Sequence, residues 1–243
     1  MSGQPQPPTR LNRRTWVACA IILVLIPATI AAGVFLLNDR RYYIVALAII
    51  VYTFLPFVLV FEHRRPQARE LVILAVLTAI GVAGRSAFFM LPQFKPVVAI
   101  VIITSVTLGP EAGFLVGAMT GFVSNFFFGQ GPWTPWQMFA FGIIGFLAGI
   151  VFRLGRLPRH RVPLAIFGGV ATFVIYGFIM DTASLFMFYA RPTKALVVAV
   201  YGSGVPMNLV HAIATVVFVL ILAKPMIEKI ERVQIKYGLI EPD

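Results

Sequence analysis

Long apolar stretches recur along this chain from Trp16 to Leu222, and they constrain its fold more than any other feature. Many of them reach the roughly 20 residues that a helix needs to cross a hydrocarbon core about 30 Å thick. In lipid, every backbone amide must be satisfied within the chain, so only helices and closed barrels can span. The stretches lack the period-two alternation of barrel strands. The sequence therefore predicts an all-α membrane protein.

Composition agrees with this class, because only 12% of the residues are charged and the mean hydropathy is +0.90. Soluble domains carry roughly 25% charged residues. We expect about eight transmembrane helices. They are placed at 16–37, 41–61, 69–90, 95–109, 111–128, 136–152, 162–190 and 203–223, and the seventh is long enough for an interfacial extension or a break near Gly177.

Composition also divides the chain into parts. We expect a disordered cytoplasmic arm at 1–15, a two-helix N-terminal extension at 16–62, a six-helix core at 67–224 and a cytoplasmic, amphipathic C-terminal tail at 225–243. The first two spans contain little glycine, whereas the stretch 81–155 is rich in it. Small residues let transmembrane helices approach closely. The core is therefore expected to be a tight bundle.

The positive charges predict the topology. One group lies at alternate membrane exits: Arg10, Arg13, Arg14, Arg64, Arg65, Arg69, Arg153, Arg156, Arg159, Arg161, Lys224, Lys229, Arg232 and Lys236. The smaller group falls on the opposite side: Arg40, Arg41, Arg85, Lys95, Arg191 and Lys194. Because cytoplasmic loops carry the excess of Lys and Arg, both termini are predicted to be cytoplasmic. The net charge of +11 thus favours anionic lipid headgroups and not a nucleic-acid partner.

Several kinds of chemistry find no support in the sequence. Cys19 is the only cysteine, which excludes an intramolecular disulfide and a zinc cluster. Paired acidic motifs, HExxH, a Gly-x-Ser-x-Gly elbow and nucleotide-binding loops are all missing. We expect neither an enzyme nor a metal protein, and no covalently bound cofactor. Any energised transport must use an ATPase on another chain.

The segment 84–96, on the predicted outer side, is the first candidate ligand site. It contains three phenylalanines, a methionine and two cations, namely Phe88, Phe89, Phe94, Met90, Arg85 and Lys95. Arg85 lies just inside the membrane, where a charge is costly unless it is paired or lines a polar cavity. Two interpretations stand: Arg85 snorkels to the interface, or the segment closes over an amphipathic ligand.

The segment 124–137 is the second candidate. Its aromatic and polar members are Asn125, Gln130, Trp133, Thr134, Trp136 and Gln137. The tryptophans suit interfacial anchors. The density of amide groups among rings is more typical of a pocket with apolar walls and a few orienting polar groups, which is the interpretation that we favour.

Three polar residues are predicted at membrane depth, where such groups usually face the bundle interior. Asp181, in the outer half of the seventh span, suits either a ligand contact or a pair with Arg85 or Arg191, and Asn208 lies in the eighth span. His211 suits either a ligand donor or a helix–helix hydrogen bond.

Two further features suggest contact with other subunits. Ala75, Ala79 and Ala83 recur every four residues and form a flat stripe on the third predicted span. Such a stripe serves either packing within the bundle or docking of another membrane protein. Glu111 follows Pro110 at a helix start, where it suits the helix dipole or an arginine of a partner.

The core resembles the substrate-binding S component of energy-coupling factor (ECF) vitamin transporters. The likeness is carried by the stripe Ala75/Ala79/Ala83, by the turn from Gly109 to Gly117, and by the stretch from Asn125 to Gly149. It covers roughly 67–224. The resemblance implies a six-helix substrate-binding bundle in a prokaryotic plasma membrane, with a lid at 85–96 and the alanine stripe against a scaffold subunit.

The resemblance also implies ligands and partners. We expect a vitamin as substrate, with cobalamin favoured and riboflavin or another flat aromatic next. We expect a transmembrane scaffold subunit and two ATPase subunits as partners. The alternative is a stand-alone secondary transporter or channel for a small amphipathic solute.

Overall fold

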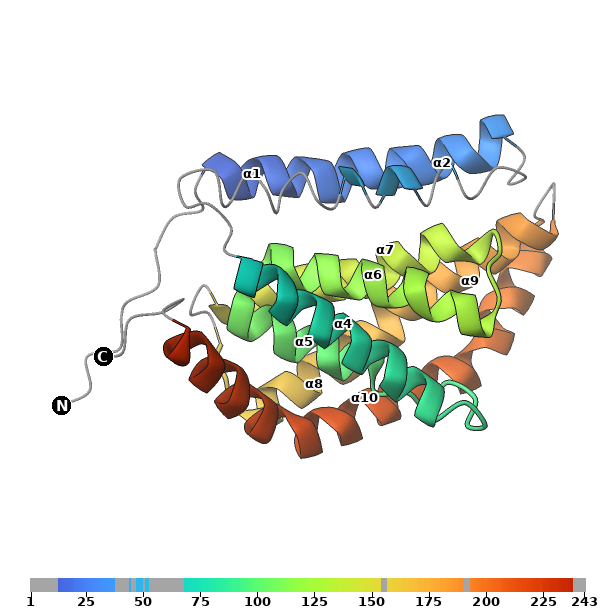
Figure 1. The fold of residues 1–243 in the computed structure, drawn as a ribbon. Coiled ribbons are helices and arrows are strands. Elements are labelled where there is room, and N and C mark those ends of the chain that lie inside the picture. Colours follow the sequence, from blue (N-terminus) through green and yellow to red (C-terminus); the bar gives the residue numbers. More distant parts are fainter. Residues whose placement is uncertain are drawn as a thin grey trace.

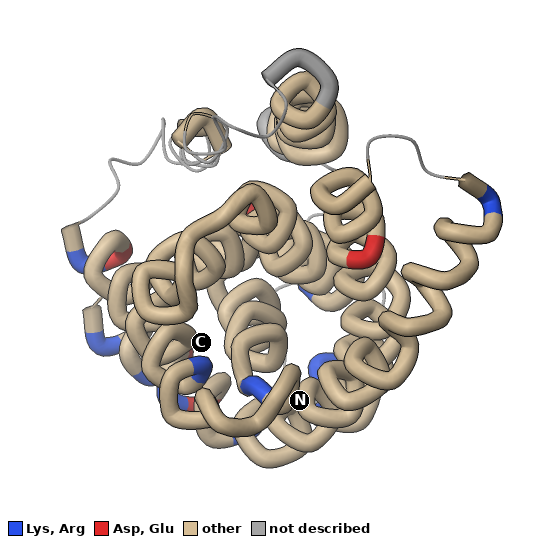
Figure 2. The backbone as a smooth tube through the Cα atoms, turned by 90° about the vertical axis from the view of Figure 1, so that its right-hand side faces the viewer, with Lys and Arg blue, Asp and Glu red and all other residues tan. Residues whose placement is uncertain are grey.

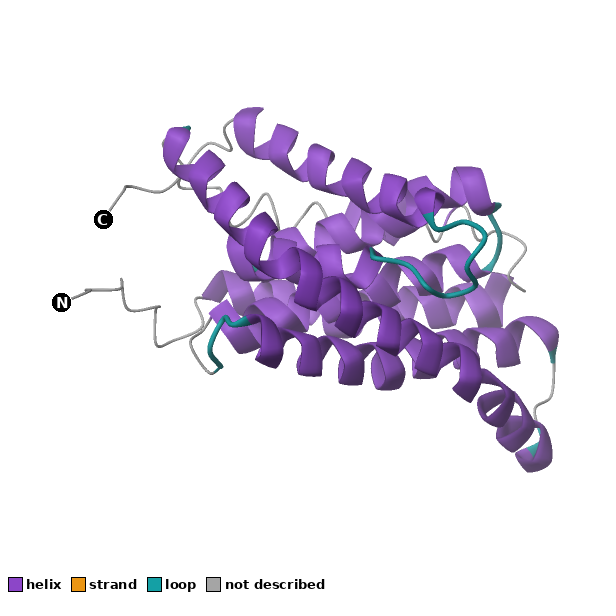
Figure 3. Ribbon diagram, turned by 90° about the horizontal axis from the view of Figure 1, so that it is seen from below, coloured by secondary structure: helices purple, strands orange, loops and turns teal. Residues whose placement is uncertain are grey.

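The computed structural model describes residues 13–37, 44, 47–49, 51–52, 68–153, 157–189 and 193–237. Throughout these ranges the regular structure is helical and no strand occurs (Figure 3). Among the described residues, six helices are long and apolar enough to cross a membrane. The prediction of a multi-pass, all-α membrane protein is confirmed. The second predicted span, 41–61, lies largely outside the described residues.

Six segments form the core of the bundle (Figure 1). In chain order they are α4 (Ala68–Ala87), α5 (Val97–Leu108), α6 (Pro110–Phe128), α7 (Trp133–Ala148) with η2 (Gly149–Arg153), α8 (Arg161–Ala171) with η3 (Thr172–Tyr176) and α9 (Gly177–Phe188), and α10 (Lys194–Lys236). They agree with the predicted spans except at their ends.

The helix α5 is the centre of the core. Its residues 97–107 are all buried, because α4, α6, α7 and α10 pack around it. At 12 residues it is about 18 Å long by the rise of an α-helix, which is shorter than a hydrocarbon core. A buried helix need not match that thickness, since its ends contact protein instead of lipid.

Glycines allow α6 and α7 to lie in close contact. A Cβ at Gly117 would fall 2.7 Å from the backbone carbonyl of Phe141, and one at Gly145 would fall 2.7 Å from the carbonyl oxygen of Gly113. No side chain fits in these places. The close approach predicted from the glycine-rich stretch is therefore confirmed at this interface.

The seventh predicted span is one long helix with a local change of pitch. The π-helical segment η3 ends at Tyr176, directly before Gly177. A Cβ at Gly177 would lie 2.7 Å from Nδ2 of Asn208, so a larger residue here would displace the Asn208 side chain of α10. Single π-helical turns inside α-helices are frequent at functional sites. The expected break near Gly177 is a π-helical turn and does not interrupt the helix.

The last helix is much longer than its predicted span. α10 runs for 43 residues and contains Pro206 and Pro225. In Figure 1 it curves along the lower side of the bundle, and internal prolines are a known cause of such bending. The segment after Lys224, predicted as a separate amphipathic tail, continues this helix to Lys236.

The N-terminal helix lies against one side of the core. It comprises α1 (Arg13–Ala20), η1 (Ile21–Leu25) and α2 (Ile26–Leu37). Its buried side chains, including Ile22 and Ile26, share a cluster with Phe114 of α6 and Met138 of α7. The first helix of the N-terminal extension is thus packed onto the α6–α7 pair.

The bundle has two distinct ends. At one end, Nη1 of Arg69 donates to the backbone oxygen of Tyr237, so the start of α4 lies beside the end of α10. At the other end lie the connection from α4 to α5 and the start of α10, at the right in Figure 1. Figure 2 looks onto this second end, along the bundle. The predicted topology makes it the outer end.

Candidate ligand-binding site

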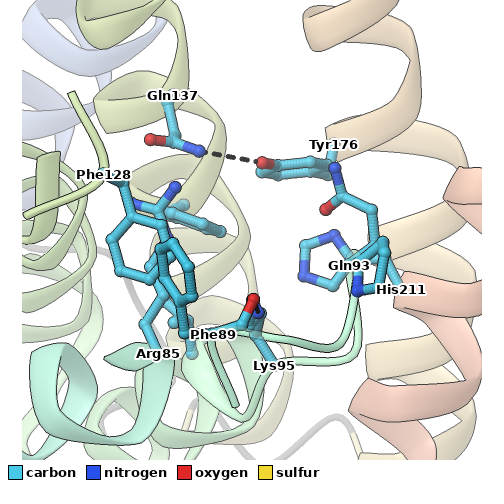
Figure 4. A pocket seen from close by; sticks show the side chains of 11 residues that line it. Arg85, Phe89, Gln93, Lys95, Phe128, Gln137, Tyr176 and His211 are labelled. Carbon is cyan, nitrogen blue, oxygen red and sulfur yellow. Dashed lines mark hydrogen bonds between the residues drawn. The ribbon is translucent and has the colours of Figure 1, made fainter. Parts of the chain in front are cut away.

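A pocket of about 240 Å³ opens at the end of the bundle where α4 connects to α5 (Figure 4). It is lined by Arg85 of α4, by Phe89, Pro92, Gln93 and Lys95 of the connection, by Val97 of α5, by Phe128 of α6, by Gln137 and Phe141 of α7, by Tyr176 of η3 and by His211 of α10. Four of the eleven lining residues are phenylalanine or tyrosine. The lining contains two cations and no acidic residue.

Arg85 is held at the wall by α6. Its Nη1 donates to Oγ of Ser124 and, at 2.8 Å, to Oδ1 of Asn125. The guanidinium carbon lies 4.4 Å from the centre of the Phe128 ring, a distance typical of a cation–π contact. The side chain is half-buried and lines the pocket.

The connection 88–96 is closed by Lys95. The Lys95 Nζ donates to the carbonyl oxygens of Phe88, Phe89 and, at 2.7 Å, Leu91, which lie just beyond the end of α4. A lysine in this place satisfies carbonyls that the helix leaves free. Burial, and then the positive charge of Arg85, lower the pKa of Lys95. The pocket rim thus carries two cations close enough to influence each other.

Backbone strain occurs at one residue of this connection. Gln93 has a φ of 55°, a conformation that is uncommon for residues other than glycine. The hydrogen bonds from Phe94 N to Pro92 O, at 2.7 Å, and from Lys95 N to Gln93 O, at 3.0 Å, close the turn around it. Its amide side chain lines the pocket. Strained residues of this kind often belong to ligand clamps.

The opposite wall joins three helices. Nε2 of Gln137 donates to the Tyr176 hydroxyl at 3.1 Å, shown as the dashed line in Figure 4. The Tyr176 ring stacks on Phe141 with centroids 5.1 Å apart. Gln137 and Phe141 are one helical turn apart on α7, so both face the pocket.

His211 completes this wall and is unusual in having no polar partner. It is 2% exposed, and neither Nδ1 nor Nε2 has a hydrogen-bond partner in the described part of the protein. The expected helix–helix hydrogen bond is therefore not formed. Oε1 of the buried Gln137 is likewise unpartnered there. Buried polar atoms in native proteins nearly always have partners, so both residues point to a ligand.

The predicted site residues divide between the pocket and its surroundings. Arg85, Phe89, Gln137 and His211 line the pocket. Asn125 is fully buried behind it and accepts from Arg85. Phe88 and Phe94 instead pack on Phe218 of α10, with centroids 5.0 and 5.4 Å from that ring, and attach the connection to the bundle.

The remaining residues of segment 124–137 lie elsewhere. Gln130 donates to the carbonyl of Phe122 and accepts from Thr134, so it fixes the turn after α6. Trp133 is 38% exposed, and Trp136 packs against the cluster below the N-terminal helix. The tryptophans therefore do not line the pocket.

Asp181 and Asn208 form a separate pair between α9 and α10. Nδ2 of Asn208 donates to Oδ2 of Asp181 at 2.9 Å. The expected pair of Asp181 with Arg85 is not formed, and Arg191 lies outside the described residues. Neither member of the pair lines the pocket.

The sequence does not identify Phe128, Phe141 and Tyr176 as lining residues. Each lies in an apolar helical segment, where a ring at helical spacing is indistinguishable from a core residue. The π-helical turn that presents Tyr176 has no signal in the sequence. Lys95 is one of the two cations noted in the segment 84–96, whereas nothing in the sequence distinguishes Gln93 from its neighbours.

The alanine stripe faces away from the bundle. Ala75, Ala79 and Ala83 are all exposed on α4. The larger side chains on the same surface, Val72, Val76 and Ile80, are exposed by 60, 51 and 43%. The interpretation of the stripe as internal packing is therefore wrong.

Glu111, for which the sequence suggests the helix dipole or an arginine of a partner subunit, has an arginine of its own chain nearby. Arg153 donates from Nη1 to the carbonyl of Thr107 at 3.1 Å. A Cβ built at Gly109 would lie 3.2 Å from Arg153 Nη1 and 3.7 Å from Glu111 Oε2, so both side chains converge on this turn. Pro110 occupies the first turn of α6, as predicted.

Residues 66–228 of the chain match the family model of the ECF-type riboflavin transporter S component. This range coincides with the predicted core and with the helices α4 to α10 that surround the pocket. No solved structure matches the chain significantly.

Several bacterial proteins are similar in sequence. A UPF0397 protein of Vibrio atlanticus is 32% identical over 116 residues, 45% of this chain and 62% of that protein. A UPF0397 protein of Aliivibrio fischeri is 34% identical over 106 residues, 42% of this chain and 56% of that protein. One from Clostridium perfringens is 25% identical over 189 residues, 69% and 94% respectively. The chain thus covers less than two thirds of the Vibrio and Aliivibrio relatives.

Proposed function

We propose that this chain, which belongs to the ECF-type riboflavin transporter S component family, captures a vitamin-like small molecule at the outer face of the membrane. It then delivers this molecule together with a transmembrane scaffold subunit and two ATPase subunits. Both termini are cytoplasmic in this proposal, in line with the distribution of Lys and Arg.

The pocket is the observation that carries the proposal. Rings and a few polar groups from the connection 88–96 and from α4, α5, α6, α7, η3 and α10 enclose a single hollow. Small-molecule sites typically combine apolar walls with a small number of orienting polar groups, and they often lie between the helices of a bundle.

The size of the pocket supports a compact ligand. Its volume of about 240 Å³ lies below the ~300–1,000 Å³ of pockets for drug-sized molecules. Cobalamin, with a corrin ring and a nucleotide arm, is larger than such molecules. A flat aromatic compound, the second choice from the sequence, therefore fits this pocket better than cobalamin.

The exposed stripe on α4 supports a partner in the membrane. Small residues allow close approach of a second helix, and Ala75, Ala79 and Ala83 are exposed on one surface. We assign this surface to the scaffold subunit. The connection 88–96, which follows α4 directly, then links the docking helix to the pocket rim.

The proposal is tested by identifying what the protein carries. The full chain is purified from cells grown in rich medium, and released small molecules are identified by mass spectrometry. A vitamin or related compound is expected, with binding reproduced by calorimetry. Release of no compound, together with no binding from a vitamin panel, would contradict ligand capture. Uptake into vesicles without scaffold and ATPases would favour a stand-alone transporter.

A further inference from the structure

The charge of the pocket is uncompensated by the protein. Arg85 donates to two neutral oxygens, those of Ser124 and Asn125. Within the described ranges no carboxylate pairs with it, and none lines the pocket. An arginine in a membrane-embedded bundle is costly unless an opposite charge or a polar cavity accompanies it. The missing charge points to the ligand.

The guanidinium is also fixed in a geometry suited to an anion. Its contacts with Ser124 and Asn125 use Nη1 alone, although a guanidinium has five N–H donors. The Phe128 ring lies against its face at 4.4 Å. Because neighbouring groups hold the side chain, little of its freedom is lost on binding. A planar carboxylate or a phosphate suits the donors that remain.

A second set of groups lies on the opposite wall. Oε1 of Gln137 can accept a hydrogen bond, and the neutral imidazole of His211 offers one donor and one acceptor. None of these atoms has a partner in the part of the chain that the structure describes. His211 lies edge-on to the rings of Tyr176 and Phe141, with interplanar angles of 89°. A rigid ring with nitrogen or oxygen atoms on its edge would satisfy this wall.

From these two walls we infer that the ligand is a compact heteroaromatic acid. Its carboxylate or phosphate binds Arg85, and the edge of its ring hydrogen-bonds to His211 and Gln137. This inference rests on the proposed function, since it specifies the substrate class of the same pocket. It goes beyond that function by requiring a negative charge on the substrate.

Matched pairs of probes test the inference on the purified full chain. The pairs are nicotinate and nicotinamide, pyridoxal 5′-phosphate and pyridoxal, and riboflavin 5′-phosphate and riboflavin. Within each pair the ring is constant and the anion is present or absent. Calorimetry is expected to show tighter binding of the anionic member in at least one pair, by about tenfold or more, the scale of a charge-assisted hydrogen bond. The pairs also separate a carboxylate from a phosphate.

Two variants separate the walls of the pocket. Arg85→Gln is expected to remove the preference for the anion and to leave the affinity for the neutral member nearly unchanged. Arg85→Lys keeps a positive charge and retains the preference, which guards against a folding defect in the first variant. His211→Phe keeps an aromatic ring and is expected to weaken both members of a pair equally. Melting temperatures verify that each variant is folded.

Several outcomes would overturn the inference. They are equal affinity within every pair, binding of none of the six probes, or an anion preference that survives in folded Arg85→Gln. If none of the probes binds but another compound co-purifies and is taken up with the partner subunits, the substrate class is wrong and the proposed function stands. If nothing binds or is transported, both fail.

Discussion

The imidazole of His211 meets the ring of Tyr176 edge to face, with ring centroids 4.5 Å apart and an interplanar angle of 89°. The Tyr176 hydroxyl also accepts a hydrogen bond from Gln137. The two contacts together join α10, η3 and α7 around the pocket. Aromatic pairs of this geometry contribute about 0.5–1.5 kcal/mol beyond the area that they bury. The polar wall is therefore built from a rigid group of side chains.

Replacing Tyr176 with phenylalanine tests this group. The substitution keeps the ring and removes the acceptor of Gln137, whose side chain is 6% exposed. Hydrogen bonds between membrane helices average about 0.6 kcal/mol and reach about 1.7, so a loss of stability in this range is expected. A double-mutant cycle with Gln137→Leu, measured by denaturation, should show coupling. Additive effects would contradict it.

Tyr201→Phe is the matched control. Its hydroxyl lies 2.6 Å from that of Thr182, away from the pocket. A similar small loss of stability is expected, but the affinity for the co-purified ligand should not change. Tyr176→Phe should lower that affinity, because Gln137 then loses its orientation.

Close packing of α6 on α7 gives a second prediction. Gly117→Ala would place a Cβ 2.7 Å from the Phe141 carbonyl, where only backbone movement can make room. Overpacking of this kind costs typically about 1–3 kcal/mol. Because Phe141 lines the pocket, we also expect weaker ligand binding. Thermal denaturation and calorimetry measure the two effects.

Gly202→Ala provides the comparison for this substitution. Nothing lies within 4 Å of a Cβ at Gly202, in the exposed part of α10. Alanine is the better helix former, by roughly 1 kcal/mol, so stability should stay the same or rise. Equal destabilisation by both substitutions would mean that the α6–α7 contact is not tight.

The sequence predicts the helices well because their determinants are local. Apolar length and glycine content establish the spans and the dense α6–α7 contact without knowledge of the tertiary structure. How deeply each helix is buried in the bundle is harder to predict. The helix α5 is too short to cross the hydrocarbon core, yet it is the most buried, since tertiary packing decides its position.

The pocket shows what sequence reasoning cannot supply. Trp136 and Gln137 are neighbours, but successive residues of an α-helix point about 100° apart. Gln137 lines the pocket and Trp136 packs toward the N-terminal helix. Only the rotation of α7 about its axis separates their roles. The sequence likewise predicts Asn208 in the site, because its direction on the helix is not known from the sequence. In the structure it donates to the Asp181 side chain outside the pocket.

The exposed alanine stripe leads to a third prediction. Ala79→Trp would add a large side chain to a surface of α4 that contacts nothing else in the described chain. If this surface meets the scaffold subunit, uptake should be abolished and ligand binding by the isolated protein unchanged. Vesicle uptake with the partner subunits and calorimetry provide the two measurements.

Ile166→Trp serves as the control for the stripe. Ile166 lies on α8 and is 63% exposed, so a tryptophan there also faces outward. Uptake should continue in this variant. Retained uptake in Ala79→Trp, or equal loss in both variants, would contradict a docking role specific to α4.

The hydrogen bonds of Lys95 give the last prediction. Lys95→Met removes the donor that holds the carbonyls of Phe88, Phe89 and Leu91. The carbonyl of Phe88 keeps its hydrogen bond from Leu91 N at 3.1 Å, but those of Phe89 and Leu91 are left to water. The connection 88–96 should therefore open more often and release ligand faster. Hydrogen exchange of amides in this connection and stopped-flow dissociation rates measure the effect.

Lys194→Met is the control for this prediction. It removes one positive charge at the start of α10, at the same end of the bundle (Figure 1), and should change neither rate. If both variants accelerate release equally, the charge matters and not the hydrogen bonds; if only Lys95→Met does so, the closure of the rim depends on this side chain.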